Sequence, residues 1–108
     1  MDNGADRFSL GFARRGRSVT VAVHGEVDGS SIAILRGLLL DVVEGQGNLS
    51  VDLDLSDMTF IDSAGLTMLL DMHRRALERG GSFVLHNPRP STVKVFEMVG
   101  LSRILTIA

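Results

Sequence analysis

Residues that could do chemistry gather in one short segment, Met58-Thr59-Phe60-Ile61-Asp62-Ser63-Ala64-Gly65-Leu66. Asp62 and Ser63 are typical of helix starts, because their side-chain oxygens can accept hydrogen bonds from free backbone N–H groups. Ala64 and Gly65 are small enough to let another chain approach closely. A serine hydroxyl in this setting can cap the helix, accept a phosphate or act as a nucleophile.

The flanking residues predict the elements that position this segment. Upstream, Leu49, Val51, Leu53 and Leu55 alternate with Ser50, Asp52, Asp54 and Ser56, the pattern of a strand with one buried face. Downstream, apolar or weakly polar residues recur at helical spacing: Leu66, Leu69, Leu70, His73 and Leu77. The segment is therefore a strand-to-helix corner that presents the hydroxyl of Ser63, and Asp52 and Asp54 are interpreted as solvent-face strand positions.

Length and composition favour one small globular module. The 108 residues are 44% hydrophobic and 22% charged, with a net charge of −2, which gives no global drive toward nucleic acid. Cysteine is absent, so the sequence offers neither a disulfide framework nor a thiolate metal site. No apolar run reaches about 20 residues. We expect a single domain over residues 1–108 with a flexible start at 1–6, located in the cytoplasm, without a metal, a cofactor, a membrane span or a direct nucleic-acid contact.

The rest of the chain predicts alternating strands and helices. In order, we expect strands at 8–13 and 18–24, a helix at 31–44, a strand at 49–55, the helix after Ser63 ending near 79–81, a strand at 82–86, a helix from Pro90 or Ser91 to Val99, and a short strand at 104–107. The first two strands form a hairpin, and the later crossovers are parallel. The predicted fold class is α/β, a mixed sheet with helices mainly on one face, because clean alternation leaves the other face partly wet.

Local details of this prediction concern turns and caps. Asp28, Ser30 or Ser31 could cap the helix at 31–44, and glycines bound the preceding loop from Gly25. Three arginines lie in the hairpin turn Arg14-Arg15-Gly16-Arg17. They could contact an acidic partner, but a solvated turn that discourages edge-to-edge pairing is the favoured interpretation.

Enzyme classes fit the motifs poorly. A hydrolase nucleophile elbow reads Gly-x-Ser-x-Gly, and here Ile61 replaces the first glycine. His24, His73 and His86 could each be nominated as the base, yet their predicted places on strands and on an apolar helix face favour structural roles. A receiver domain needs an acidic pair after its first strand, where this chain has Ala13-Arg14-Arg15. No phosphate-binding loop motif is present either, so we expect a binding module that is not an enzyme.

The order of elements, the loop Gly25-Glu26-Val27-Asp28, the phrase Val51-Asp52-Leu53-Asp54-Leu55-Ser56 and the corner Phe60 to Leu66 together resemble the STAS domain. More narrowly, the chain resembles bacterial anti-sigma factor antagonists. The resemblance covers roughly Arg7 to Ala108 and includes the turn Val99-Gly100-Leu101.

This resemblance implies a partner-switching regulator. Such a domain binds an anti-sigma factor with serine kinase activity, is phosphorylated by it on the corner serine and is then released, and a phosphatase restores the unmodified form. The matching serine is Ser63, with Thr59 and Thr67 as secondary candidates. The expected partner surface comprises Asp28, Asp62, Ser63, Ala64, Gly65 and Thr67. We expect the protein itself to be a monomer or a weak dimer. Other family members are phospho-acceptors or scaffolds in larger signalling assemblies, or parts of membrane transporters.

The resemblance leaves the local role of these residues open. A serine at a helix start is commonly only an N-cap, and Asp62 could be either a cap or a contact that orients the kinase. Asp28 could cap a helix and also belong to the partner surface. A phosphate on Ser63 would face the positive end of the helix dipole, while Asp62 would oppose it.

Overall fold

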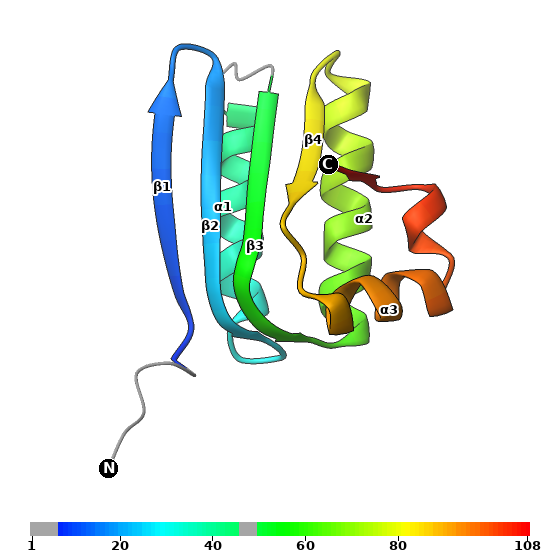
Figure 1. Ribbon diagram of the computed structural model, residues 1–108. Coiled ribbons are helices and arrows are strands. Elements are labelled where there is room, and N and C mark those ends of the chain that lie inside the picture. Colours follow the sequence, from blue (N-terminus) through cyan, green and yellow to red (C-terminus); the bar gives the residue numbers. More distant parts are fainter. Residues whose placement is uncertain (1–6, 46–49) are drawn as a thin grey trace.

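A computed structural model of the chain describes residues 7–45 and 50–108. The elements are β1 (Ser9–Arg15), β2 (Ser18–Val27), α1 (Ile32–Leu40), a π-helical turn (Asp41–Gly45), β3 (Ser50–Ile61), α2 (Ser63–Glu78), β4 (Ser82–His86), α3 (Pro90–Met98), a 3-10 turn (Leu101–Arg103) and β5 (Thr106–Ile107) (Figure 1). The predicted strand residue Leu49 and the predicted flexible start at 1–6 lie outside the described residues.

The five strands form one sheet in the order β1-β2-β3-β4-β5. β1 and β2 are antiparallel and joined by a tight turn at Gly16 and Arg17, and all the later pairs are parallel. Gly16 has a φ of 60°, a conformation that glycine adopts without a steric cost. The predicted hairpin followed by parallel crossovers is therefore confirmed.

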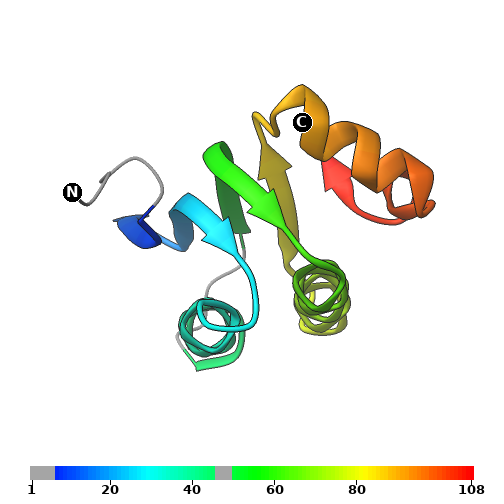
Figure 2. The ribbon, with the colours of Figure 1, turned by 90° about the horizontal axis from the view of Figure 1, so that it is seen from below.

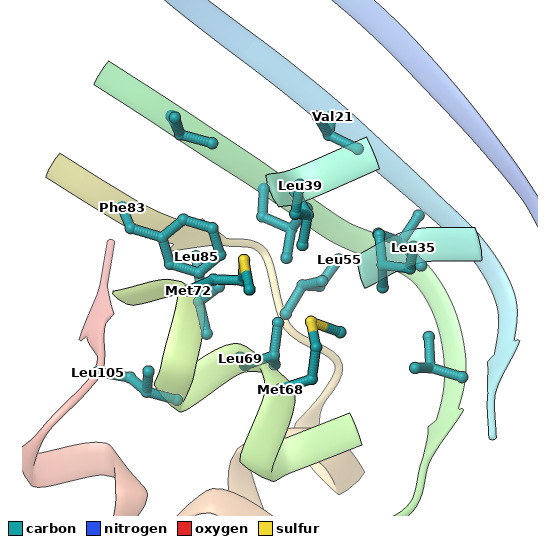
Figure 3. Close-up of a cluster of buried hydrophobic side chains, with 14 of the residues drawn as sticks. Val21, Leu35, Leu39, Leu55, Met68, Leu69, Met72, Phe83, Leu85 and Leu105 are labelled. Atoms are coloured by element: carbon teal, nitrogen blue, oxygen red, sulfur yellow. The ribbon is translucent and has the colours of Figure 1, made fainter. Parts of the chain in front are cut away.

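α1 and α2 lie side by side on one face of the sheet (Figure 2). Between the helices and the strands lies the hydrophobic core, where Leu39, Met72 and Leu85 are fully buried (Figure 3). α3 instead lies at the end of the sheet where β3 and β4 finish, close to the start of α2 (Figure 1). The prediction that most helices cover one face is confirmed, and the corner after β3 sits at an end of the molecule rather than over the sheet.

β3 continues farther than the alternation predicted, to Ile61 rather than Leu55. The register between β2 and β3 shifts twice. One shift lies between Ala22 and His24 of β2, and the other lies between Gly25 and Glu26. At each bulge β3 carries an extra residue, which breaks the period of two that the sequence pattern depends on. β2 likewise runs to Val27, where a loop beginning at Gly25 was expected. These longer strands carry the corner to the end of the sheet, where Val27, Ile61 and Leu66 close the core.

Three apolar residues that the sequence pattern placed in helix faces or in the last strand are exposed in the structure, namely Leu77, Val99 and Ile104. Leu77 is 55% exposed because the buried face of α2 is centred on residues such as Leu69 and Met72. Val99 is also 56% exposed, since α3 ends at Met98. β5 is shorter than predicted and begins at Thr106, after a turn that contains Ile104. The exposed side chains of Leu77, Val99 and Ile104 therefore leave apolar surface next to α2.

Candidate functional site

Asp62 is the residue that joins β3 to α2. It is the N-cap of α2, and its Oδ1 accepts a hydrogen bond of 2.9 Å from the N–H of Gly65. Its own N–H donates to the carbonyl of Val27 at 3.1 Å, which fixes the corner to the end of β2. The capping interpretation of Ser63 is therefore wrong, because Ser63 is already the first residue of the helix.

Ser63 is exposed, and its hydroxyl makes no hydrogen bond to any residue that the structure describes. Its carbonyl accepts a bond of 3.0 Å from Oγ1 of Thr67, one helical turn away. Ala64 and Thr67 are exposed beside it. The corner thus holds the Ser63 backbone rigidly through neighbouring groups while the side-chain oxygen stays available to another molecule.

The secondary phosphorylation candidates are less accessible. Oγ1 of Thr59 is buried and has no hydrogen-bond partner, so a kinase could reach it only if β3 opened. Thr67 is exposed, but its hydroxyl donates to the carbonyl of Ser63. Among these three hydroxyls, that of Ser63 is the one both exposed and unengaged.

Gly65 does not lie on the contact surface where it was predicted. It is buried, and a Cβ added to it would lie 2.6 Å from Cγ1 of Ile61 and 3.2 Å from Cγ1 of Val27. Such distances are shorter than side chains normally allow. The absence of a side chain at Gly65 therefore lets α2 pack against β2 and β3, and this correction removes Gly65 from the surface that a partner could contact.

Asp28 and Asp62 lie at the same end of the sheet, where β2 and β3 finish. Asp28 directly follows Val27, which pairs with Ile61. Its carboxylate accepts bonds from the Oγ and the N–H of Ser30, at 2.9 and 3.1 Å, and these hydrogen bonds lower the pKa of Asp28 below its usual value. Ser31 is the N-cap residue of α1, one of the three residues predicted for this position, but its side chain makes no capping hydrogen bond to the helix. The loop is held instead by the buried Ser31 hydroxyl, which donates to the carbonyl of Glu26 at 2.7 Å.

Shallow grooves flank the exposed first turns of α2. One of about 230 Å³ separates α2 from the segment after α3, and it is lined by Ser63, Leu66, Thr67, Leu70, Val99 and Leu101. Another of about 330 Å³ lies toward α1 and is lined by Ile32, Arg36, Ala64, Thr67, Met68 and Asp71. Sequence reasoning missed Val99, Leu101, Arg36 and Asp71 as neighbours of the corner, because their proximity depends on how distant elements pack.

Asp71 holds α2 to α1 through an arginine cluster. Its carboxylate accepts bonds from Arg75 at 3.0 Å, Arg74 at 2.6 Å and Arg36 at 3.1 Å, and Arg36 comes from α1. These contacts, that with Arg75 above all, lower the pKa of Asp71 to about 2. The spacing of Asp71 and Arg75 is a sequence signal for part of this cluster, but the link to Arg36 is not.

Among the described residues, no histidine makes a hydrogen bond with the hydroxyl of Ser63. His24 and His86 pair with Asp57 at 3.2 Å and Asp52 at 2.7 Å on the sheet face away from α1 and α2. His73 is on α2 itself, and ten helical residues from Ser63 correspond to about 15 Å. Among residues 7–45 and 50–108, no group of acidic and histidine side chains could hold a metal ion. No helix in these ranges is long and apolar enough to span a membrane.

Comparison with known proteins gives a consistent family. A family model described as "Mlab, STAS domain" matches residues 10–106. The anti-sigma-B factor antagonist of Bacillus subtilis is 29% identical over 90 residues, covering 83% of this chain and 81% of that protein. The anti-sigma F factor antagonist of Paenibacillus polymyxa is 24% identical over 87 residues, covering 81% of this chain and 74% of that protein.

Solved structures with the same fold include an anti-sigma factor antagonist from Mycobacterium paratuberculosis, with a TM-score of 0.82 and 22% identity over 94% of this chain and 86% of that one. The anti-sigma factor antagonist SpoIIAA matches in its unphosphorylated form with a TM-score of 0.79 and 23% identity, covering 93% of this chain and 88% of that one. The phosphorylated form of Bacillus SpoIIAA matches with a TM-score of 0.72 and 24% identity, covering 94% of this chain and 91% of that one. The family match covers nearly the whole described sheet and its helices, and the chain belongs to the STAS domain family.

Proposed function

We propose that this chain is an anti-sigma factor antagonist that works by partner switching. In its unmodified form it binds an anti-sigma factor with serine kinase activity in the cytoplasm, and phosphorylation of Ser63 by that partner releases it until a phosphatase removes the phosphate. The observation that carries the proposal is the exposed, unbonded hydroxyl of Ser63 at a corner fixed by the Asp62 cap. The names of the curated relatives support the antagonist role, and we infer no catalytic activity for the chain itself.

The proposed contact surface surrounds Ser63. It comprises the exposed residues Ser63, Ala64 and Thr67 together with the half-buried Asp28 and Asp62. The grooves on either side of α2 add apolar contact, including Leu66 and Val99. A partner that fits this surface would desolvate the serine hydroxyl, which costs far less than desolvating a charged group.

A phosphate on Ser63 would meet acidic neighbours. Asp62 already occupies the N–H of Gly65, so its carboxylate lies where the helix start would otherwise attract an anion. The nearby arginine of α1, Arg36, is paired with Asp71. A phosphate carries close to two negative charges near pH 7. A desolvation and repulsion penalty of about 2–4 kcal/mol would weaken binding roughly thirty- to a thousandfold.

The test is reconstitution with the cognate kinase, found by co-purification from native lysate and mass spectrometry. Incubation with ATP should place one phosphate on Ser63. The Ser63→Ala variant should still bind the kinase but accept no phosphate, and Ser63→Asp should weaken binding only in part, because one charge on a shorter arm imitates the phosphate incompletely. Ser91→Ala is a matched control, since Ser91 is also exposed in the first turn of a helix; it should behave like the unaltered chain.

Two results would count against the proposal. Mapping of the phosphate to a residue other than Ser63 would contradict the site. If calorimetry showed that the phosphorylated protein binds the kinase as tightly as the unmodified form, release by charge would be wrong, and the chain would fit better as a phospho-acceptor or scaffold within a lasting assembly.

A further inference from the structure

A larger groove runs along the outer side of α2, beyond the surface proposed for the kinase. It has a volume of about 770 Å³ and lies between α2 and the segment that contains Arg103 and Ile104. Its apolar wall includes Leu70, Leu77 and Ile104, and the last two are 55% and 53% exposed. Small-molecule sites commonly measure about 300–1,000 Å³ and are mostly apolar with a few polar groups, so this groove has the size and lining of such a site.

His73 is a polar group in this groove that the proposed switching does not use. It lines the groove, its residue is only 7% exposed, and its Nδ1 is buried without a hydrogen-bond partner. A buried polar atom without a partner costs about 1–3 kcal/mol. His73 therefore adds a mostly covered polar side chain to the lining of the groove.

The charges around the groove favour an anion. Arg103 makes no ion pair or hydrogen bond through its side chain with the described residues. Arg74, also in the lining, is bound to Asp71 at 2.6 Å and to Glu78 at 2.9 Å. Asp71 is in turn shared among three arginines. The acidic charge in the groove is therefore already matched, and Arg103 is left as a cation able to bind an incoming carboxylate.

We propose that this groove binds a small amphipathic carboxylate. Its hydrocarbon body lies along Leu70, Leu77 and Ile104, and its carboxylate pairs with Arg103. A charge-assisted hydrogen bond from an arginine is strong enough to select an anion over a neutral molecule of the same length. This site shares Thr67, Leu70 and Asp71 with the grooves that flank the proposed kinase surface. Its distinguishing residues, Arg103, Ile104 and Leu77, lie outside that surface, so the proposal does not depend on partner switching.

Decanoate is the probe, added to the full chain labelled with ¹⁵N and kept below its micelle concentration. Amide signals of residues 70–77 and 103–104 should shift in a saturable manner, together with the imidazole nitrogens of His73. Decanol, which has the same chain without charge, should bind about tenfold more weakly, and the decyltrimethylammonium cation should not shift these signals. Equal binding of all three molecules, or shifts confined to the neighbourhood of Ser63, would overturn the proposal.

Variants identify the charge that selects the ligand. Arg103→Gln should weaken decanoate binding about tenfold, which is about 1.4 kcal/mol, and leave decanol binding unchanged. Arg79→Gln is a matched control, because Arg79 is exposed at the end of α2 and does not line the groove. Equal effects of the two substitutions would contradict a role for Arg103. If no amphiphile bound but Arg103→Gln weakened kinase binding, the groove would be a protein docking surface and the ligand proposal would be wrong.

Discussion

At the scale of single residues, Asp62 and Ser63 divide two tasks that either could have performed. Asp62 supplies the cap, and its carboxylate bonds the N–H of Gly65. Ser63 is thereby left with a hydroxyl that no described residue engages. A serine that capped the helix would have its oxygen committed to the backbone. The separation explains how one corner can be both rigid and open to modification.

The cap can be tested by replacing Asp62. Asp62→Ala removes the acceptor for Gly65 and should lower the free energy of unfolding by about 1 kcal/mol. Asp62→Asn keeps a side-chain oxygen at the same place and should lower the free energy of unfolding by only a few tenths of a kcal/mol. Urea denaturation followed by circular dichroism measures both. A loss as large in Asp62→Asn as in Asp62→Ala would mean that charge, rather than the hydrogen bond, stabilises the corner.

Gly65 and Gly37 both lie inside helices but differ in the space around them, so they can be compared as variants. A Cβ at Gly65 would lie 2.6 Å from Ile61, whereas one at Gly37 would meet nothing within 4 Å. Gly65→Ala should therefore destabilise the protein by about 1–3 kcal/mol through overpacking. Gly37→Ala should stabilise it by about 0.5–1 kcal/mol, because alanine has the higher helix propensity. Thermal unfolding of both variants checks the signs, and stabilisation by Gly65→Ala would refute the close packing described for the corner.

At the scale of elements, local periodicity predicted what depends on neighbours in the chain. The hairpin, the crossovers and the strand-to-helix corner at Asp62 follow from alternation and helical spacing. The two bulges of β3 could not be predicted, since they arise from pairing with β2. The burial of Gly65 and the approach of Val99 to Ser63 also depend on distant segments. The sequence therefore located the phosphorylation candidate but not the surface around it.

The Asp71 cluster links α1 to α2 and should make stability depend on acid pH. The folded-state pKa of Asp71 is lowered from about 3.8 to about 2, so the stabilisation is present above about pH 4 and is lost as the pH falls through 2. Because the Asp71 side chain is 21% exposed, solvent screening limits the effect to about 1 kcal/mol.

The measurement compares Asp71→Asn with the unaltered chain by urea unfolding at several pH values. The variant should be less stable at pH 5, and the difference should shrink toward zero near pH 2. Glu78→Gln is the control, since its exposed pair with Arg74 should contribute less than about 0.5 kcal/mol at any pH. A difference between Asp71→Asn and the unaltered chain that stayed constant with pH would show that the carboxylate charge of Asp71 is not what joins the helices.

At the scale of the whole molecule, the exposed residues of the candidate site lie at the end of the core, which Val27, Ile61 and Leu66 close from beneath. The fully buried residues Val21, Leu53 and Leu85 lie where the sheet meets α1 and α2. The corner with Ser63 lies at the end of the sheet, beside α3 (Figure 1). The open face of the sheet carries polar pairs such as His86 with Asp52. Because Ser63 is exposed, a change of charge on its side chain acts at the surface and displaces no buried side chain.

Phosphorylation of Ser63 should accordingly leave the fold and its stability almost unchanged. The Ser63 side chain is exposed and bonds no described residue, so a phosphate displaces nothing, and its interactions with Asp62 and the helix start are worth about 1 kcal/mol at most. A domain with about 5–15 kcal/mol of stability stays folded under such a change. Hydrogen exchange should then show equal protection of β2, β3 and β4 in both forms, with differences confined to residues 60–67. Loss of protection across the sheet would mean that the phosphate acts by loosening the domain, and release through surface charge would be the wrong mechanism.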